Sequence, residues 1–357
     1  MGRYALPEPQ RYQRFRQKQG NIAYASGVTA PLQISQTDYL TQLDVMSNQT
    51  VTTLTTAVVV AGYKAYGPLS NVQVKVNGGR APYALPGFHA NEYLKVWNND
   101  YTDAMVSDPI VTNSTNQWKN HVRIPLTVDP LSDKGAWYTG DTALNLSVAL
   151  TFAAATTVLS TATGATLQGS YDVWSEKYSG PQPDAPNGWL DQISYYKQTE
   201  LYLSGGVLSN GSTTFNLETD QDFVRIGFVF YTGSNADSTF APAAGLFTSM
   251  SLIINDKFAI FDGIDEQTLL FENLNDYYAS SATTQNMGTG VYWLDFQRFR
   301  IPTRDEILPT DPDQAKRLQL KIVSGSANNR VDIITDTMVD SQFAEKWARS
   351  AKARGAK

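Results

Sequence analysis

The residues of this chain best suited to chemistry are two histidines and two groups of carboxylates. His89 and His121 are the only histidines, and neither lies in the closely spaced pattern of His, Asp or Glu that a metal site needs. The chain has no Gly-x-Ser-x-Gly turn, no His-Glu-x-x-His motif and no phosphate-binding loop with a lysine. We therefore predict structural roles for both histidines, and neither a metal nor a cofactor.

The carboxylates gather in two stretches, and a glycosidase needs only two such groups. Asp262, Asp265 and Glu266 form the denser stretch, while the other lies in the proline-interrupted segment 305–313. Acidic residues at 265 and 266 suit the N-terminus of a predicted helix, because they complement its dipole, and segment 305–313 is predicted to be a solvated loop. Calcium at either stretch stays an alternative, although neither has EF-hand spacing. No catalytic residue is predicted, so the chain is not expected to be an enzyme.

Composition favours a β-rich protein of two domains. The 357 residues include 19 Tyr, 15 Phe and 25 Gly but no Cys, a balance that suits pleated sheets joined by tight turns. The length is comfortable for two domains. The absence of cysteine excludes disulfides, thiolate metal sites and cysteine catalysis. No export signal or membrane span is predicted, so we expect synthesis and folding in the cytoplasm.

Both ends of the chain are basic, whereas the chain as a whole has a net charge of −6. Residues 1–20 carry five basic side chains and one acidic one, and residues 340–357 carry five against two. Segment 11–20 is predicted to be a short helix ending at Gly20 or an extended arm. Its interleaved basic and aromatic residues suit a lipid or nucleic-acid surface, with a solvated tail as the alternative. The arm residues singled out are Arg3, Arg11, Arg14, Phe15, Arg16 and Lys18.

The strongest organisational signal is an internal repeat at about half the chain length. In each half, an alternating strand ends at an Asn, at 77 and at 255, and a Gly, a helical stretch and Asn-Asp-Tyr follow. Later in each half comes Arg-Ile-Pro. A single repetition at this offset indicates a duplicated domain rather than a solenoid. The positions that mark the repeat are Gly87, Asn99, Asp100, Tyr101, Arg123 and Pro125, answered by Gly263, Asn275, Asp276, Tyr277, Arg300 and Pro302.

Each copy is predicted to contain seven or eight strands and one short helix, which favours an all-β protein of two tandem eight-stranded jelly-roll sandwiches. Immunoglobulin-like or lectin-like sandwiches are the alternative, but long inserts and an internal helix suit a jelly roll better. Helices are predicted over 90–98, 266–274 and 341–353. The predicted parts are a basic N-terminal arm (1–30), a first jelly roll (31–178), a Pro/Gly linker (179–190), a second jelly roll (191–339) and a basic C-terminal helix (340–357).

This organisation resembles the double jelly-roll major capsid proteins of tailless, membrane-containing bacterial viruses, the tectivirus-like group. The resemblance covers nearly the whole chain and depends on the repeat, the basic arm and the cysteine-free body. It implies a homotrimer that forms a pseudo-hexagonal tile of an icosahedral shell and contacts neighbouring trimers. It also implies a vertex protein and an inner membrane or minor capsid proteins as partners, assembly in host cytoplasm, and no specific nucleic-acid readout.

Two other classes of protein stay open at this point. A two-domain carbohydrate-binding or carbohydrate-active protein would stack sugars on exposed tryptophans, but the seven tryptophans are scattered along the chain and suit core packing. A surface-layer or adhesion protein would need export. The tryptophans concerned are Trp97, Trp118, Trp137, Trp174, Trp189, Trp293 and Trp347.

Overall fold

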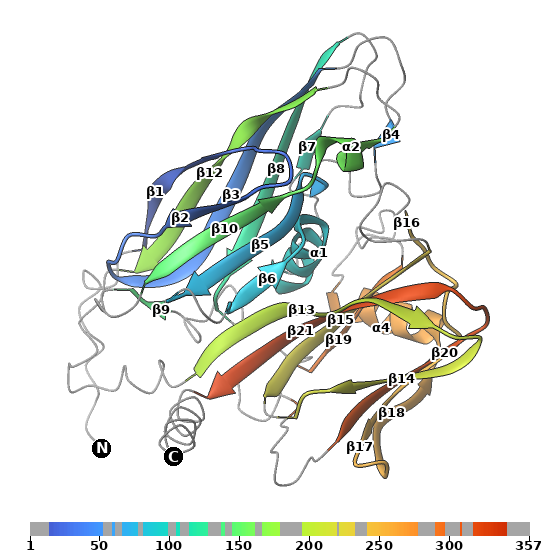
Figure 1. Cartoon of the computed structure of the whole chain (residues 1–357). Helices are drawn as coiled ribbons and strands as arrows, with labels where there is room; N and C mark the ends of the chain where they lie inside the picture. Colours follow the sequence, from blue (N-terminus) through green and yellow to red (C-terminus); the bar gives the residue numbers. More distant parts are fainter. Residues whose placement is uncertain are drawn as a thin grey trace, which may run out of the picture.

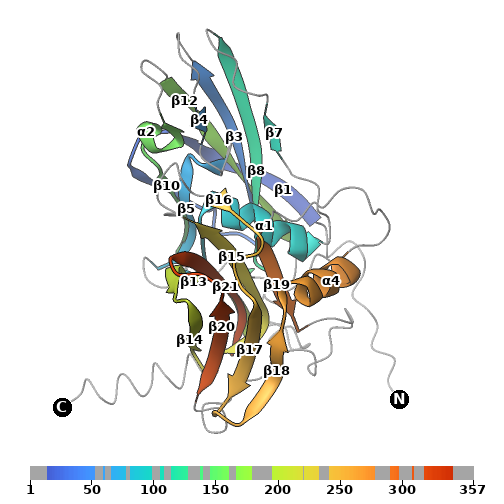
Figure 2. The same cartoon turned by 90° about the vertical axis from the view of Figure 1, so that its right-hand side faces the viewer.

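The computed structural model shows two β-sandwiches, one from each half of the chain (Figures 1 and 2). None of the helices among the described residues is long and apolar enough to cross a membrane. The residues that the structure describes are 14–52, 59–60, 66–77, 81–98, 105–107, 114–127, 137–139, 145–160, 166–178, 195–219, 221–232, 241–277, 290–296, 308 and 317–340.

The first sandwich consists of two facing sheets. One contains, in spatial order, β1 (Arg14–Ala23), β12 (Thr166–Tyr178), β3 (Tyr39–Thr52), β8 (Thr115–Pro125) and β7 (Met105–Ser107), with β9 (Trp137–Tyr138) beside β3. The facing sheet contains β2 (Thr29–Gln33), β10 (Leu146–Phe152), β5 (Leu69–Val76) and β6 (Tyr83–Leu85). A small ladder of β4 (Val59–Val60) and β11 (Leu159–Ser160) lies beside the short helix α2 (Ala155–Val158).

The second sandwich repeats this plan. One sheet contains β13 (Tyr195–Leu208), β21 (Asn329–Asp340) and β15 (Asp222–Thr232), with β19 (Val291–Asp295) and β16 (Ala241–Pro242) both paired to β15. The facing sheet contains β14 (Gly211–Leu217), β20 (Leu318–Ser324), β17 (Ser249–Ile254) and β18 (Phe258–Ile264).

The strand order confirms two tandem eight-stranded jelly rolls. Counting eight main strands along each described half, one sheet of either sandwich pairs the first, eighth, third and sixth strands, and the other pairs the second, seventh, fourth and fifth. This interleaved order is that of a jelly roll. In both sandwiches a helix follows the fifth strand, α1 (Gly87–Asn98) in the first and α4 (Glu266–Tyr277) in the second. The helices predicted at 90–98 and 266–274 are thereby confirmed, with bounds three residues longer at one end.

The asparagines that mark the repeat have the same structural role in both domains. Asn77 and Asn255 follow the fourth main strand and adopt positive φ values of 50° and 52°, a backbone region that Asn tolerates better than most residues. Each side-chain oxygen accepts a hydrogen bond from the backbone of the opposite strand, from Asn145 N at 2.6 Å and from Arg317 N at 3.1 Å. The repeated Asn is therefore a repeated turn.

The predicted N-terminal arm over 1–30 is wrong for its second half. Residues 14–23 form neither a helix nor a free arm but the edge strand β1, which pairs antiparallel with β12 from Arg14 opposite Tyr178 to Ala23 opposite Ser170. Residues 14–18 alternate between basic and other side chains, which is the period of a strand. Because the repeating residues are charged rather than apolar, the sequence suggests a solvent-exposed arm. Residues 1–13, the linker and the C-terminal helix lie outside the described residues.

The apolar core of the first domain extends across the boundary between the two domains. A cluster around Val72, Val74 and Leu150 of the first sandwich also includes Trp293 and Ile334 from the second. Another cluster, around Phe228 and Leu320, belongs to the second sandwich alone. The two jelly rolls therefore share part of one core.

Candidate functional site

The joint between the two jelly rolls is the most elaborate site in the structure. The edge strand β6 of the first domain pairs in parallel with β13 of the second, with Tyr83 opposite Thr199 and Ala84 opposite Glu200. Thr199 N donates to the carbonyl of Pro82 at 2.9 Å. One sheet therefore continues from the first domain into the second (Figure 1).

Helix α1 of the first domain lies against the outer face of the second domain's sheet. His89 Nε2 is 2.8 Å from Asp332 Oδ2, and Tyr93 Oη donates to Asp336 Oδ2 at 2.9 Å. Residues four apart share one face of a helix, and residues four apart also share one face of a strand. The spacing on α1 thus matches that on β21, and the two contacts fix the helix on the sheet.

The two aspartates are buried and surrounded by donors. Asp332 also accepts from Gly205 N at 2.6 Å and Tyr231 Oη at 2.9 Å. Asp336 also accepts from Thr199 Oγ1 at 2.9 Å and Arg225 Nη1 at 3.1 Å. Buried charges are tolerated only when they are paired and hydrogen-bonded, and these two satisfy that condition.

Burial opposes ionisation of Asp332, but the hydrogen bond and charge of His89 and the donors Gly205 and Tyr231 outweigh it and lower the pKa of Asp332. Burial, followed by the Asp336 charge, raises the pKa of Tyr93 well above its ordinary value. Lys197 completes the joint, since its Nζ donates to the Pro125 carbonyl at 3.1 Å and lies 4.7 Å from the Tyr93 ring centre. Asp332 is thus ionised at neutral pH, inside a joint built from buried hydrogen-bond donors.

A second ionic cluster lies on the outer face of the first domain's sheet. Asp44 is fully buried and contacts Arg16 Nη2 at 2.7 Å, His121 Nε2 at 2.7 Å and Arg123 Nε at 3.0 Å. Burial works against the charged form, but His121 and Arg123 together lower the pKa of Asp44. The Arg16 side chain, 43% exposed, extends over the ring of Trp174. Arg16, His121 and Arg123 thus cover the one fully buried carboxylate of this cluster.

The described arm residues are paired rather than free. Arg14 contacts Glu176 at 2.8 Å and Lys18 contacts Asp172 at 2.9 Å, in addition to the Arg16 pair with Asp44. Phe15 lies on the same strand and is half-buried. Arg3 and Arg11 lie outside the described residues. The positive charge predicted for an arm is therefore partly neutralised inside the first sheet.

Several repeat-marking residues have a local reason to be conserved between the halves of this chain. A Cβ at Gly87 would lie 2.9 Å from both the Leu69 side chain and the Tyr66 carbonyl, so only glycine fits the start of α1. Gly263 has φ of 68°, which favours glycine. Arg123 and Pro125 contribute to the two networks described above. Asn275, Asp276 and Tyr277 end α4, whereas Asn99, Asp100, Tyr101, Arg300 and Pro302 lie outside the described residues.

The carboxylates near residue 265 have structural roles, as predicted. Asp265 Oδ1 accepts from Thr268 N at 2.7 Å and so caps α4. Glu266 accepts from Gly245 N at 2.7 Å and also bonds the Tyr292 hydroxyl. Among the described residues, no group of three or more His, Asp or Glu could hold a metal ion. Of segment 305–313, the structure describes only residue 308.

Sequence reasoning missed the aspartates that organise both networks. Asp332 and Asp336 stand in the otherwise apolar strand VDIITD, and Asp44 stands between Leu43 and Val45. The available signal was a charge in a strand that should be buried, because such charges need partners. Their partners could not be predicted, since His89 and Asp332 are separated by 243 residues.

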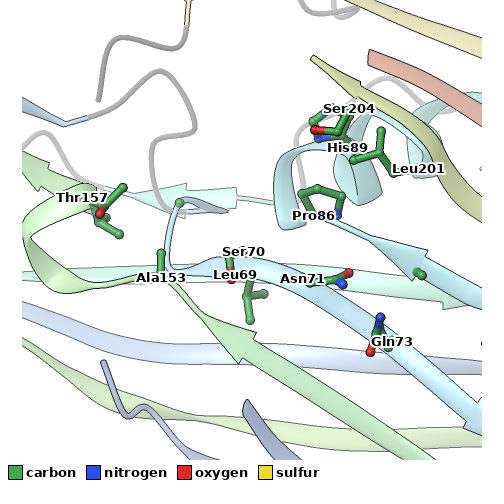
Figure 3. Close-up of a pocket in the computed structure, with 13 residues that line it drawn as sticks. Leu69, Ser70, Asn71, Gln73, Pro86, His89, Ala153, Thr157, Leu201 and Ser204 are labelled. Carbon is green, nitrogen blue, oxygen red and sulfur yellow. The ribbon is translucent and has the colours of Figure 1, made fainter. Parts of the chain in front are cut away.

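A cavity of about 450 Å³ lies behind the joint, between β5, the start of α1 and β13 (Figure 3). Its size is within the usual range of ligand pockets. The polar groups that line it are amides and hydroxyls, with His89 at one side. The described residues that line it include no carboxylate, lysine or arginine. Its polar lining consists of Ser70, Asn71, Gln73, His89, Thr157 and Ser204.

Comparisons with known proteins identify this fold. No family model and no curated protein sequence matches the chain. Among solved structures, the major capsid protein of Sulfolobus turreted icosahedral virus matches with a TM-score of 0.70 at 11% identity, covering 93% of this chain and 98% of that one. The major capsid protein of bacteriophage PM2 matches with a TM-score of 0.57 at 15% identity, covering 92% and 98%.

A third match is the PBCV-1 capsid protein VP54, with a TM-score of 0.58 at 13% identity over 94% of this chain and 95% of that one. Both jelly rolls and the joint between them are included in alignments of this extent. The fold of this chain is therefore the double jelly roll of viral major capsid proteins, which confirms the predicted fold class and, at the level of fold, the predicted resemblance.

Proposed function

We propose that this chain is the major capsid protein of an icosahedral virus and acts as a structural protein without enzymatic activity. The observation that carries the proposal is the match of both domains, in one arrangement, to capsid proteins over 92–94% of the chain. The described residues support it further, because their buried ionic groups are used in packing rather than directed at a substrate.

The working unit is a homotrimer that contacts neighbouring trimers. Three copies of a duplicated domain present six similar jelly rolls, so the trimer has a pseudo-hexagonal outline and can tile a shell with one kind of protein. Closed cyclic symmetry is the usual form of such oligomers. The shared core between the two domains supports this role, since a tile must keep its shape at every position in the shell.

The proposed location is the virion capsid, after synthesis in the host cytoplasm. The partners beyond the chain itself are a vertex protein and an inner membrane or minor capsid proteins. The basic ends, with Arg3 and Arg11 in the first 13 residues and five basic side chains in 340–357, would face the inside of the shell. No specific nucleic-acid readout is proposed.

The test is the solution mass of the purified chain by light scattering after size exclusion, followed by electron microscopy for shells or sheets. A trimer has three times the mass of the 39.4 kDa chain and supports the tile. A monomer at micromolar concentration would contradict it.

Carbohydrate binding is the competing function, and the tryptophans do not favour it. Trp97, Trp118 and Trp293 are buried, and Trp137 and Trp174 are only partly exposed, whereas sugar stacking needs an open ring face. Trp189 and Trp347 lie outside the described residues. Specific binding on a broad glycan array would revive this function.

A further inference from the structure

We infer that copies of this chain join by repeating its internal joint: strand β18 of one copy extends the sheet at β1 of the next, and helix α4 lies on that copy's outer face around Asp44. The inference rests on the proposed trimer and names the surfaces that form it. The internal joint uses the fifth main strand, the helix after it and the outer face of a sheet. Each copy presents a second set of these three parts.

The first support is a pair of open sheet edges. Strand β18 is the last strand of its sheet and pairs only with β17 among the described strands, and β1 is likewise an end strand that pairs only with β12. In the first domain, β6 has the position of β18, and its edge is covered by β13. Open edges in a soluble protein invite pairing with another chain.

The second support is the outward face of α4. Counted from the equivalent turn residues Asn77 and Asn255, His89 and Tyr93 of α1 correspond to Gln267 and Phe271 of α4. Gln267 is exposed, and Phe271, in the position of Tyr93, is 64% exposed. Within residues 87–97 of α1, by comparison, every residue except Phe88 is buried. A phenylalanine this exposed on the helix that should be covered indicates a missing partner surface.

The third support is charge. The sheet that receives α1 presents Asp332 and Asp336, and α1 brings His89 to them. On the sheet that would receive α4, the cations Arg14, Arg16 and Lys18 are each more exposed than the carboxylate with which they pair. Helix α4 contains three acidic residues and no basic one. Complementary charge fixes register and partner choice at interfaces. In the internal joint the sheet supplies the carboxylates and the helix the histidine. In the proposed joint the sheet supplies the exposed cations and the helix the carboxylates.

The register follows from the internal joint. Tyr83, which pairs with Thr199, also lies opposite Val74, three residues before Asn77. Phe261 likewise lies opposite Leu252, three residues before Asn255. Thr199 pairs with Asp336 on β21, whereas Arg16 pairs with Glu176 on β12.

Asp336 and Glu176 occupy equivalent places, because each ends an outward-facing acidic pair on the last strand of its domain. These pairs are Asp332 with Asp336 and Asp172 with Glu176. Arg16 therefore corresponds to Thr199, and the joint brings Phe261 of one copy opposite Arg16 of the next and Asp262 opposite Gln17. Each copy gives one surface and receives one, which is the arrangement that closes into a ring.

The test uses the absence of cysteine in the chain. The double variant Asp262→Cys/Gln17→Cys, oxidised as the assembled protein, should give covalent bands of two and three chains on non-reducing gels. Each single variant should give only one-chain bands. Arg16, His121 and Arg123 still contact Asp44 in this variant. The internal pair Ala84→Cys/Glu200→Cys is the positive control, because it should lose both free thiols without a change of mass.

A second variant tests the helix. Phe271→Arg should reduce the light-scattering mass from three chains to one, whereas Val207→Arg, at a residue 53% exposed on β13, should leave three. Trimers that form no cross-links and persist in Phe271→Arg would overturn this joint and leave the proposed function standing. A wild-type chain that is monomeric would instead contradict the proposed function itself.

Discussion

At the scale of single residues, the two outer sheet faces are organised by buried aspartates. Asp332 and Asp336 anchor α1 from the other domain, and Asp44 gathers two arginines and a histidine from the two strands β1 and β8. A buried ion pair adds little stability compared with apolar packing, but removing one partner leaves an uncompensated group and is costly. These aspartates therefore determine the position of the packed elements more than they add to the free energy of folding.

We expect Asp332→Ala to lower the free energy of unfolding by about 3–5 kcal/mol, the usual cost of breaking a buried ion pair. His89, Tyr231 and the Gly205 amide would all lose their shared acceptor. Urea unfolding followed by circular dichroism measures the change. Arg317→Ala is the control, because its pair with Asp256 is more than half exposed and is worth at most about 1 kcal/mol. Equal losses in the two variants would contradict the assignment.

The same aspartates predict how stability depends on pH. Asp44 and Asp332 have folded pKa values below the ordinary 3.8, so below that pH the unfolded chain binds more protons than the folded one. Their contribution is complete above the unfolded pKa and is lost as pH falls toward the folded values. We expect the wild-type free energy of unfolding to fall below about pH 4, and Asp44→Asn to show a shallower fall. Urea titrations at pH 7 and pH 3 compare the two.

At the scale of elements, the sheets accommodate large side chains by leaving room opposite them. Gly227 on β15 pairs directly with Trp293 on β19, and the indole covers the glycine while its ring lies 5.8 Å from that of Tyr93 on α1. A Cβ at 227 would lie 2.6 Å from Trp293 Cη2. Because residue 227 has no side chain, the Trp293 indole can lie close to the sheet, and its position determines how closely α1 packs on the second domain.

We expect Gly227→Ala to destabilise the fold by about 1–3 kcal/mol, because overpacking moves Trp293 away from its place. Gly325→Ala is the matched control, since its added Cβ would meet only the Thr248 methyl group at 3.8 Å. Thermal unfolding of the two variants measures the difference. A Gly227→Ala variant as stable as Gly325→Ala would show that the indole has free space to move.

At the scale of the whole molecule, the sequence predicts the duplicated domain but not the contact between the two domains. The repeated Asn, Gly and helix lie within segments of about 30 residues, so their pattern can be read locally. The joint depends on partners more than 240 residues apart, which no local pattern specifies. The edge strand β1 is not predicted for a different reason. Its period of two is carried by the basic residues Arg14, Arg16 and Lys18 rather than by apolar residues.

The shared core predicts that the two jelly rolls unfold as one unit. Trp293 and Ile334 of the second domain belong to the first domain's cluster, and Asp332 and Asp336 bind α1. Opening either domain alone would expose this surface and leave buried charges unpaired, so partial unfolding is costly. We expect one transition, with tryptophan fluorescence and far-ultraviolet circular dichroism coinciding as two-state unfolding requires. Asp332→Ala should separate the two signals. Two well-separated transitions of the wild-type chain would mean that the joint is only a loose contact.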